Sequence, residues 1–577
     1  GWDATVVPAN EVIPVFGGYA DMPWDQSSEE LPPSEVYAFR FENRWAGNSS
    51  YEHTAQSALT QYPFLGAEYG PGIQITYHRR PVISSDDVAA MLPVQIGSGV
   101  NLYGYYMFHG GTNPRGKLTT LQESQRTGYP TDVPVKSYDF QAPLSEFGGM
   151  RESFRKLKLF HYFLHDFGAD LAPMAVRRPA RVAASTADTT VLRVSARTAG
   201  NRGYIFVNNY LRNYSMPARP GTQISLRLQN ETLQVPQQPI DIPAGAYFIW
   251  PVNLDMSGAT LKYSTAQLLT RVASGASQVY FFFEVPGIPA EFVFNASSVA
   301  SLDAPVAHVS RGNGRIVVRR LQPGLHEAIA VRTSTGQHVR IVLLSREQAL
   351  NAWRPRLAGA ERLFLADDDV YFDADTAYLR SFNEPEFSFA VFPAFERAPE
   401  PSAALATTSG LFTRYAAVLP GRMPGDVAVV PQREADRVPP VKLFNAVSWR
   451  KVEIALAPSD SAFEMAARYQ IDVPADVLDG TDDVILEIKY VGDVARLYSR
   501  GELLNDNFYN GTPWRISMKR YIEAIRRGPL ELRILPLRSD APIYIPAALR
   551  PAFPESGQVA QLQSLQAIPV YELKLRP

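Results

Sequence analysis

The chain has 577 residues, no cysteine, a formal net charge of −2 and no run of 18 apolar residues. A chain of this length exceeds what one hydrophobic core can stabilise, so we expect three or more domains. The balanced charge argues against a nucleic-acid or anionic-membrane binder, the missing cysteines exclude disulfides and thiolate metal sites, and the missing apolar run predicts no transmembrane helix.

The first part of the chain alternates predicted strands with predicted helices. Short apolar runs that end near glycines predict strands at residues 12–16, 63–70 and 100–111. Residues 84–99 begin with Ser-Ser-Asp-Asp, whose hydroxyl caps and first-turn acids are typical of a helix start. Residues 150–168 carry apolar side chains at helical spacing and end at a glycine that we expect to stop the helix. This alternation predicts a parallel sheet.

The pattern changes at about residue 175. Helical periodicity nearly vanishes, and short strands are separated by Gly, Pro, Asn and Asp, as in RGYIFVNNY (202–210) and GAYFIWPVNL (245–254). About 400 residues of this kind predict several β-sandwich domains. Residues 396–410 are rich in Pro, Ala and Ser, which predicts an exposed linker or long loop.

One carboxylate stands at the end of a predicted strand. Glu68 follows Phe64, Leu65 and Ala67, which predict a buried strand. In a parallel barrel, functional groups gather at the C-terminal strand ends. A lone glutamate there is more often a solvated loop residue or a helix cap, but aromatic residues and glycines recur at the same level of the neighbouring strands. A carboxylate among aromatic rings suits sugar hydrolysis, because rings stack on a pyranose and the carboxylate stabilises or captures an oxocarbenium-like centre.

Other clusters of polar residues have ordinary structural explanations. His161 and His165 stand at helical spacing without the glutamate of a metalloprotease helix, so we expect them to pack against the barrel. Asp367, Asp368 and Asp369 lack the spacing and the central glycine of an EF-hand, which favours a solvated turn over a calcium site.

The order of three segments carries more information than any one of them. PFLGAEYGPG, then NLYGYYMFHGGTNP, then SYDFQAPLSEFGGM resembles glycoside hydrolase family 35, the β-galactosidases. In that family a glutamate ends the seventh barrel strand, a Tyr-Met-Phe-His-Gly-Gly-Thr-Asn segment ends the eighth, and a Ser-Tyr-Asp-Tyr-x-Ala-Pro-Leu loop follows.

The resemblance implies an α/β plus all-β fold. We expect an incomplete (β/α)8 TIM barrel, with strands six to eight, followed by several antiparallel β-sandwich or jelly-roll domains. The expected boundaries are 1–170 for the C-terminal part of the barrel, 171–260 and 261–350 for two β-domains, and 351–577 for a jelly-roll region with the terminal strand.

The resemblance also implies site residues. Glu68 matches the catalytic nucleophile, and Tyr106, Tyr138 and Tyr19 match sugar-contacting tyrosines, for which barrel-rim packing is the alternative. Phe140 stands where the family has a second loop tyrosine, so one phenolic hydroxyl is absent.

A second catalytic carboxyl is not identified. The family's general acid/base lies in an Asn-Glu-Tyr-Gly stretch at the end of strand four, and no such stretch occurs here. Glu11, Glu35 and Glu42 precede Glu68 but do not match that motif. We therefore expect the acid/base to lie outside this chain, which we interpret as the C-terminal part of an enzyme and as inactive alone.

The predicted reaction is hydrolysis of terminal non-reducing β-D-galactosyl residues by a retaining double displacement, with no metal or organic cofactor. The implied partners are a β-galactoside oligo- or polysaccharide and the N-terminal barrel portion as a separate chain, with no nucleic acid and no membrane. We expect a secreted or periplasmic protein rather than a cytoplasmic one. Two alternatives stay open: a non-catalytic carbohydrate-binding protein, and a β-glycosidase that prefers another sugar.

Overall fold

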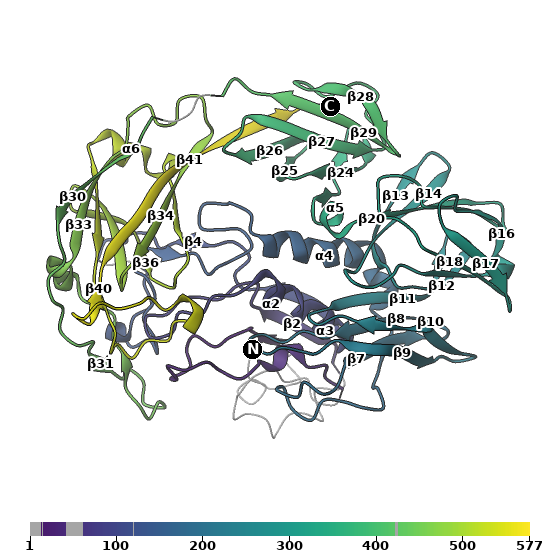
Figure 1. The fold of residues 1–577 in the computed structure, drawn as a ribbon, viewed down its shortest axis with the longest axis horizontal. Helices are drawn as coiled ribbons and strands as arrows, with labels where there is room; N and C mark the ends of the chain where they lie inside the picture. The colour runs from purple at the N-terminus through teal and green to yellow at the C-terminus, as the bar shows by residue number, and fades with distance from the viewer. Residues whose placement is uncertain (1–12, 14, 42–61, 119–120, 422–424) are drawn as a thin grey trace.

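The structure, a computed structural model, describes residues 13, 15–41, 62–118, 121–421 and 425–577 (Figure 1). It is mostly β, and most of its sheets are antiparallel, as the sequence predicted for the larger part of the chain. Among these residues, none of the helices combines the length and the apolar character needed to cross a bilayer.

A three-stranded parallel sheet lies near the N-terminus. Its order is β1 (Val15–Gly18), β2 (Phe64–Tyr69) and β3 (Val100–Tyr105), with both neighbouring pairs parallel, as predicted. Phe64 and Tyr69 are buried, Leu65 is half-buried and Ala67 is exposed. The expectation of a fully buried strand is therefore wrong at Ala67, because no described residue covers that side chain.

Two helices occupy the segment predicted as one, α2 (Ser85–Ala89) and α3 (Met91–Gly97). The predicted start is confirmed, because Ser84 and Asp87 form a capping box. The break has a local cause: Pro93 has no N–H to donate to the carbonyl of Ala89 four residues earlier.

The long helix α4 (Glu152–Leu171) joins three hydrophobic cores. Phe163 packs in the core shared with the parallel sheet, Leu159 belongs to the next core along the chain, and Phe154 packs against a third. The helix runs through Gly168 instead of stopping there, and the Gly168 carbonyl accepts a hydrogen bond from Ala172 N–H at 2.8 Å. Figure 1 shows α4 at the centre of the molecule, with sheets around it.

The two histidines of α4 differ. His161 Nε2 lies 2.8 Å from the Tyr105 hydroxyl of β3, and burial lowers the pKa of His161 to about 4. His161 therefore packs on the parallel sheet, as expected. His165 lies one turn further along the helix and is exposed, so the same expectation is wrong for it, because no described residue covers its side chain.

An eight-stranded sheet and a five-stranded sheet follow. The eight-stranded sheet has the order β17 (His308–Gly312), β18 (Arg315–Arg319), β15 (Phe292–Asn295), β12 (Ala259–Ser264), β11 (Tyr247–Met256), β8 (Arg202–Asn208), β7 (Arg193–Ala199) and β6 (Ala175–Arg177). The five-stranded sheet consists of β13 (Gln267–Ser274), β14 (Ser277–Phe283), β20 (His338–Leu344), β19 (Ile329–Thr333) and β16 (Val299–Asp303). β9 (Arg219–Arg227) and β10 (Thr232–Ile242) form a separate ribbon, and α5 (Arg346–Leu350) follows β20. The larger sheet runs across the expected boundary between residues 260 and 261, because β12 and β15 continue the ladder of β11.

Three five-stranded sheets make up the C-terminal part. The first consists of β21 (Ala352–Trp353), β24 (Leu363–Ala366), β27 (Glu386–Phe392), β29 (Phe412–Val418) and β28 (Ala403–Ser409). The second consists of β25 (Asp369–Asp373), β26 (Thr376–Phe382), β41 (Gln561–Leu575), β34 (Asp483–Val491) and β37 (Trp514–Ser517). The third consists of β30 (Ala428–Arg433), β33 (Ala467–Asp472), β38 (Leu530–Ile534), β35 (Val494–Ser499) and β36 (Glu502–Phe508), with α6 (Ile522–Arg526) before β38.

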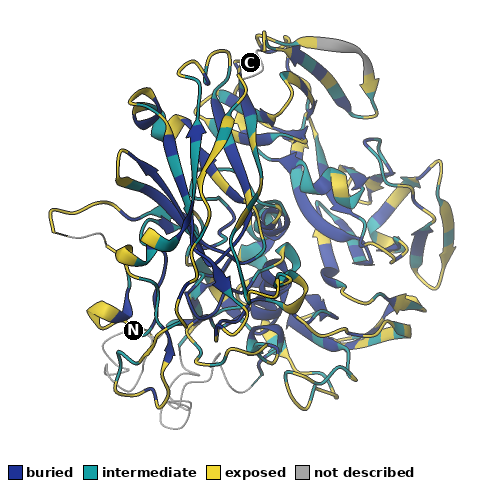
Figure 2. Cartoon of the chain, turned by 60° about the vertical axis from the view of Figure 1, so that its left-hand side comes forward, coloured by how far each residue is buried: buried dark blue, intermediate teal, exposed yellow. Residues whose placement is uncertain are grey.

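Short ribbons complete the fold: β4 (Gly111–Thr112) with β5 (Ser137–Tyr138), β22 (Arg356–Leu357) with β23 (Ala360–Glu361), β31 (Leu443–Phe444) with β32 (Ile454–Ala455), and β39 (Leu537–Arg538) with β40 (Gln558–Val559). Figure 2 shows that buried residues follow the sheets and the central helix, whereas exposed residues gather at turns and strand ends.

Two loop predictions in this part are wrong. Residues 403–409 of the expected linker form β28, whose backbone groups pair with β29. Asp369 of the expected solvated turn is buried, and its Oδ2 accepts a hydrogen bond from Met150 N–H at 2.9 Å. Arg155 Nη2 also lies 3.3 Å from Asp369 Oδ1, so this carboxylate fastens β25 to the start of α4.

Candidate active site

Glu68 lies at the C-terminal end of β2, opposite Gly17 of β1. The Tyr19 hydroxyl donates a hydrogen bond to Glu68 Oε1 at 2.5 Å. Burial, together with this carboxylate, raises the pKa of Tyr19, which keeps the phenol protonated as a donor. Gly70 makes the approach possible, because a Cβ there would stand 2.1 Å from the Tyr19 ring.

Phe140 gathers the predicted tyrosines around its ring. The Phe140 ring centroid lies 6.2 Å from that of Tyr19, 5.5 Å from that of Tyr106 and 5.9 Å from that of Tyr138. Trp24 meets Tyr19 edge-on at 5.2 Å. The structure therefore brings the three tyrosines predicted from the sequence and Phe140 into one aromatic group, which Tyr19 joins to the Glu68 carboxylate.

The Tyr138 hydroxyl lies between two acceptors. It is 3.1 Å from Gln74 Oε1 and 3.3 Å from Glu123 Oε1. Burial raises the pKa of Tyr138, and the neighbouring Tyr106 and Glu123 raise it further. Burial also raises the pKa of Glu123, against the effect of the Tyr138 hydrogen bond. Sequence reasoning missed Glu123, because it lies in a loop with no motif or periodicity to mark it.

Two other polar residues after β3 support the backbone. His109 Nδ1 lies 2.5 Å from the carbonyl oxygen of Gly110, and Asn113 Nδ2 donates to the carbonyl of Val135 at 3.3 Å. These contacts hold the loops that follow β3. His109 and Asn113 therefore stabilise the backbone near the aromatic group through these hydrogen bonds.

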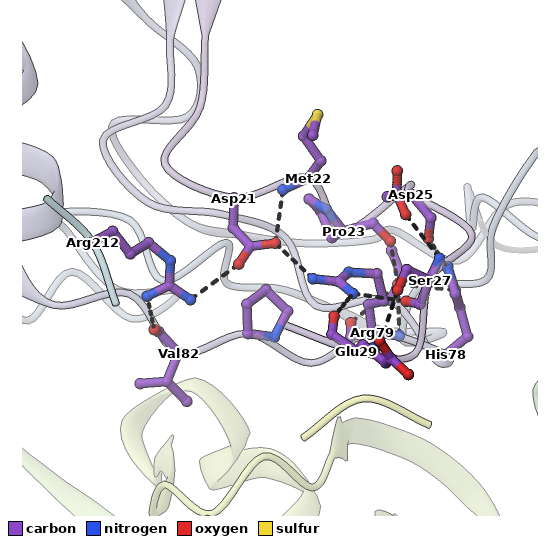
Figure 3. A network of polar contacts seen from close by, with 12 residues as sticks. Asp21, Met22, Pro23, Asp25, Ser27, Glu29, His78, Arg79, Val82 and Arg212 are labelled. Atoms are coloured by element: carbon purple, nitrogen blue, oxygen red, sulfur yellow. Dashed lines mark hydrogen bonds and ion pairs between the residues drawn. The ribbon is translucent and has the colours of Figure 1, made fainter. Parts of the chain in front are cut away.

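The loop after Tyr19 is fixed by a buried ionic cluster (Figure 3). Asp21 Oδ1 lies 3.1 Å from Arg79 Nη2, and Asp21 Oδ2 lies 3.0 Å from Arg212 Nη2. Arg79 also donates from Nη1 to the carbonyls of Ser27 and Glu29, each at 2.7 Å. The one carboxylate thus joins the loop after β1, the segment after β2 and the turn that follows β8.

The segment after Glu68 is fastened to the C-terminal sheets. Arg80 Nη2 lies 2.5 Å from Asp493 Oδ1, and the Tyr77 hydroxyl donates to Asp493 Oδ2 at 2.7 Å. Arg80 and Tyr77 are buried, and Tyr77 belongs to the hydrophobic core of the C-terminal sheets. Figure 1 shows β30, β33, β34 and β36 of these sheets on the left of the molecule, whereas β24, β27, β28 and β29 lie at its top.

A buried aspartate of the C-terminal part orders the loop that carries Tyr138. The Asp506 carboxylate accepts hydrogen bonds from the backbone N–H groups of Val135, Lys136 and Ser137 at 2.7, 2.8 and 3.2 Å. The path of the loop into β5 is therefore set by a residue of β36.

Glu146 links the same ribbon to β36. Its carboxylate accepts hydrogen bonds from the hydroxyls of Thr112 in β4 and Ser137 in β5 and, at 2.8 Å, from Asn505 Nδ2. Burial outweighs these donors and raises the pKa of Glu146 to about 7. This glutamate therefore changes charge in the neutral pH range beside the aromatic group.

The other glutamates weighed as acids are placed only in part. Glu11 and Glu42 lie outside the described residues. Glu35 begins a short 3-10 helix, and its Oε2 lies 3.6 Å from Arg40 Nη2. Glu35 is therefore an ion-pair partner of Arg40.

Two segments of the chain match models of known protein families. Residues 6–164 match the family described as Glycosyl hydrolases family 35, and residues 177–351 match the domain described as Beta-galactosidase, domain 2.

Three curated fungal relatives are similar over part of the chain. A probable beta-galactosidase A from Neosartorya fischeri is 27% identical over 267 residues, which is 45% of this chain and 24% of the relative. A probable beta-galactosidase A from Aspergillus fumigatus is 26% identical over 323 residues, and a beta-galactosidase A from Penicillium sp. is 25% identical over 318 residues. Each of these two alignments covers 53% of this chain and 29% of the relative. The matched part of the chain thus spans about a quarter of the length of these relatives. Residues 6–164 are thus similar to glycosyl hydrolases family 35, and residues 177–351 to domain 2 of β-galactosidases.

Proposed function

We propose that this chain carries the nucleophile half of a retaining β-galactosidase, with Glu68 as the nucleophile. The observation that supports this most is the Glu68 carboxylate at the C-terminal end of a parallel strand, hydrogen-bonded by Tyr19 at 2.5 Å inside a group of aromatic rings. The family match of residues 6–164 and the names of the relatives favour a β-galactoside as the substrate.

The proposed chemistry has two displacements. A Glu68 oxygen attacks the anomeric carbon of a terminal non-reducing β-D-galactosyl residue while the bond to the leaving oxygen breaks, which gives a covalent glycosyl-enzyme. Water then attacks the same carbon and releases Glu68 with net retention. Tyr19 holds the carboxylate in one orientation, and the rings of Tyr106 and Tyr138 contact the sugar.

The leaving oxygen needs a proton, and the proposal assigns its donor to a carboxyl outside this chain. The sequence contains no Asn-Glu-Tyr-Gly stretch, which supplies the acid/base in the family that it resembles. Acid–base assistance contributes about 10²–10⁴-fold, so the chain alone should not cleave an alkyl galactoside at a useful rate.

The three parallel strands fit strands six to eight of an incomplete barrel in this proposal. Among the described strands, β1 and β3 each have β2 as their single sheet neighbour. A closed barrel has no sheet edge, so a chain with strands one to five would pair with both edges. Co-expression with such a chain should restore activity.

A substrate with an activated leaving group tests the nucleophile without requiring the general acid. The 577-residue chain mixed with 2,4-dinitrophenyl β-D-galactoside should release dinitrophenolate in a burst, because this leaving group departs without a proton. Glu68→Gln should abolish the burst and leave the far-UV spectrum unchanged. A burst that survives Glu68→Gln would remove Glu68 from its role. Galactose binding without any burst would favour the non-catalytic carbohydrate-binding alternative.

A further inference from the structure

A second carboxylate, Glu123, lies at the far end of the aromatic group from Glu68. The contacts run from Glu68 to Tyr19, Phe140, Tyr138 and Glu123 in turn. We propose that Glu123 is a substrate-recognition residue, which accepts a hydrogen bond from a saccharide hydroxyl remote from the anomeric carbon. This inference rests on the proposed function of the same site.

The hydrogen bonds around Tyr138 leave acceptor capacity free. Tyr138 has one hydroxyl proton, but Gln74 Oε1 and Glu123 Oε1 both lie within reach of it, at 3.1 and 3.3 Å. The second oxygen of Glu123 receives no hydrogen bond from the described part of the chain. Because a half-buried carboxylate accepts several hydrogen bonds, a donor from the ligand fits this position.

The surroundings of Glu123 suit a sugar. The Phe140 ring, 5.9 Å from the Tyr138 ring, has no polar atom, so the polar contacts on this side come from Tyr138, Gln74 and Glu123. Tyr106 is 41% exposed, which leaves part of its side chain open for contact. Aromatic rings beside acceptors of hydroxyl protons are the groups that bind the apolar faces and the hydroxyl edges of a pyranose.

The turn that carries Glu123 is held on both sides. Its own carbonyl accepts a hydrogen bond from Val133 N–H at 3.2 Å. The next residue, Ser124, donates to Asp132 Oδ1 at 2.8 Å. Gln125, which is buried, donates from Nε2 to Asp132 Oδ2 at 2.9 Å and to the carbonyl of Ala455 in β32 at 3.1 Å. These contacts fix the position of Glu123 before any ligand arrives, which is what selective binding requires.

The test uses the whole chain and the dinitrophenolate burst. Galactose and β-linked galactobiose compete with the activated substrate, and their inhibition constants are measured for the unmodified chain, Glu123→Gln and Glu123→Ala. Loss of a hydrogen bond to a charged acceptor should weaken at least one inhibitor about tenfold or more, with the larger effect in Glu123→Ala. Weaker binding of both sugars places the hydroxyl on the reacting ring. Weaker binding of galactobiose alone places it on the leaving ring.

A double-mutant cycle distinguishes direct contact of Glu123 with the sugar from a structural role in which Glu123 only positions Tyr138. If Glu123 merely holds Tyr138, then Glu123→Ala in the Tyr138→Phe background should change neither inhibition constant further. If Glu123 contacts the sugar, that background should still show the loss. The matched control is Glu555→Gln, an exposed carboxylate far along the chain.

Unchanged inhibition constants in both Glu123 variants, with the burst and thermal stability intact, would overturn the inference. A missing burst in the unmodified chain counts against the proposed function instead.

Discussion

At the residue scale, the hydrogen bond between Tyr19 and Glu68 ties the candidate nucleophile to the loop after β1. The bond is 2.5 Å long, and Gly70 leaves the space in which the Tyr19 ring lies. Glu68 lies at the end of β2 and Tyr19 follows the end of β1, so the orientation of the carboxylate depends on the pairing of these two strands.

The first prediction concerns Tyr19→Phe. The ring and its packing stay, but the donor to Glu68 is lost, so the carboxylate is no longer held in one orientation. The burst rate with the dinitrophenyl galactoside should fall about tenfold or more, because a hydrogen bond to a charged group contributes about 1.5–3 kcal/mol. Binding of galactose, measured by calorimetry, should change less than the rate. An unaltered burst rate would show that this bond does not serve the nucleophile.

How far the sequence predicts such residues depends on the motif that carries them. Glu68, Tyr106 and Tyr138 stand in segments with a recognisable order, and the structure brings them together with Tyr19. Glu123 could not be found in this way, because its approach to Tyr138 depends on a loop fixed by Asp132 and by a strand of the C-terminal part. No local pattern encodes such a contact.

At the element scale, the ribbon of β4 and β5 depends on one half-buried glutamate, Glu146. Hydroxyls of both strands donate to Glu146, and Asn505 of β36 joins them. Burial favours the neutral form of this carboxyl, with a folded-state pKa of about 7 against an ordinary value of 4.5. The ribbon therefore has different electrostatics below and above neutral pH.

The second prediction follows from the sign of this shift. Below pH 4.5 both the folded and the unfolded chain hold the proton, and above about pH 7 neither does. Between these values the folded state retains a proton that the unfolded state has lost, so stability falls as the pH rises. The contribution of Glu146 to the free energy of unfolding should fall by about 3 kcal/mol between pH 4.5 and pH 7, since one pKa unit corresponds to about 1.4 kcal/mol.

Urea unfolding at pH 5 and pH 8 measures this loss, and Glu146→Gln should remove it while Glu555→Gln keeps it. Equal pH dependence in Glu146→Gln and in the unmodified chain would contradict the account.

Elements were predicted best where periodicity is strong. The three strands, the start of α2 and the body of α4 follow the sequence pattern. The break between α2 and α3 follows from Pro93, which the pattern of apolar residues does not register. Residues 403–409 were expected in a linker because of their composition, but pairing with β29 satisfies their backbone and overrides that preference.

At the scale of the whole molecule, the candidate site is assembled from distant parts of the chain. Arg80 and Asp493 are 413 positions apart in sequence, and Asp506 reaches back to the loop before Tyr138. The sequence could not indicate these pairs, because a buried ion pair between distant segments leaves no local periodicity. They make the N-terminal loops and the C-terminal sheets dependent on each other.

The third prediction concerns Asp493→Ala. This change leaves Arg80 buried without its carboxylate and takes an acceptor from Tyr77. The free energy of unfolding should fall by about 3–5 kcal/mol, which is typical when one partner of a buried ion pair is removed. The burst amplitude should fall with it, because the same segment follows Glu68. The matched control is Asp540→Ala, which removes a surface ion pair with Arg538 and should lower the free energy of unfolding far less. Equal losses of unfolding free energy in the two variants would contradict the proposal that the N-terminal loops and the C-terminal sheets stabilise each other.

The most direct test of the account is the identity of the residue that becomes glycosylated. The full chain is incubated with 2,4-dinitrophenyl 2-deoxy-2-fluoro-β-D-galactoside, whose leaving group needs no acid and whose fluorine slows release of the covalent intermediate. After protease digestion, peptide mass spectrometry locates the added sugar. The account predicts a single fluorogalactosyl group on Glu68, absent from Glu68→Gln. A label on any other residue, or no label at saturating reagent, would contradict it.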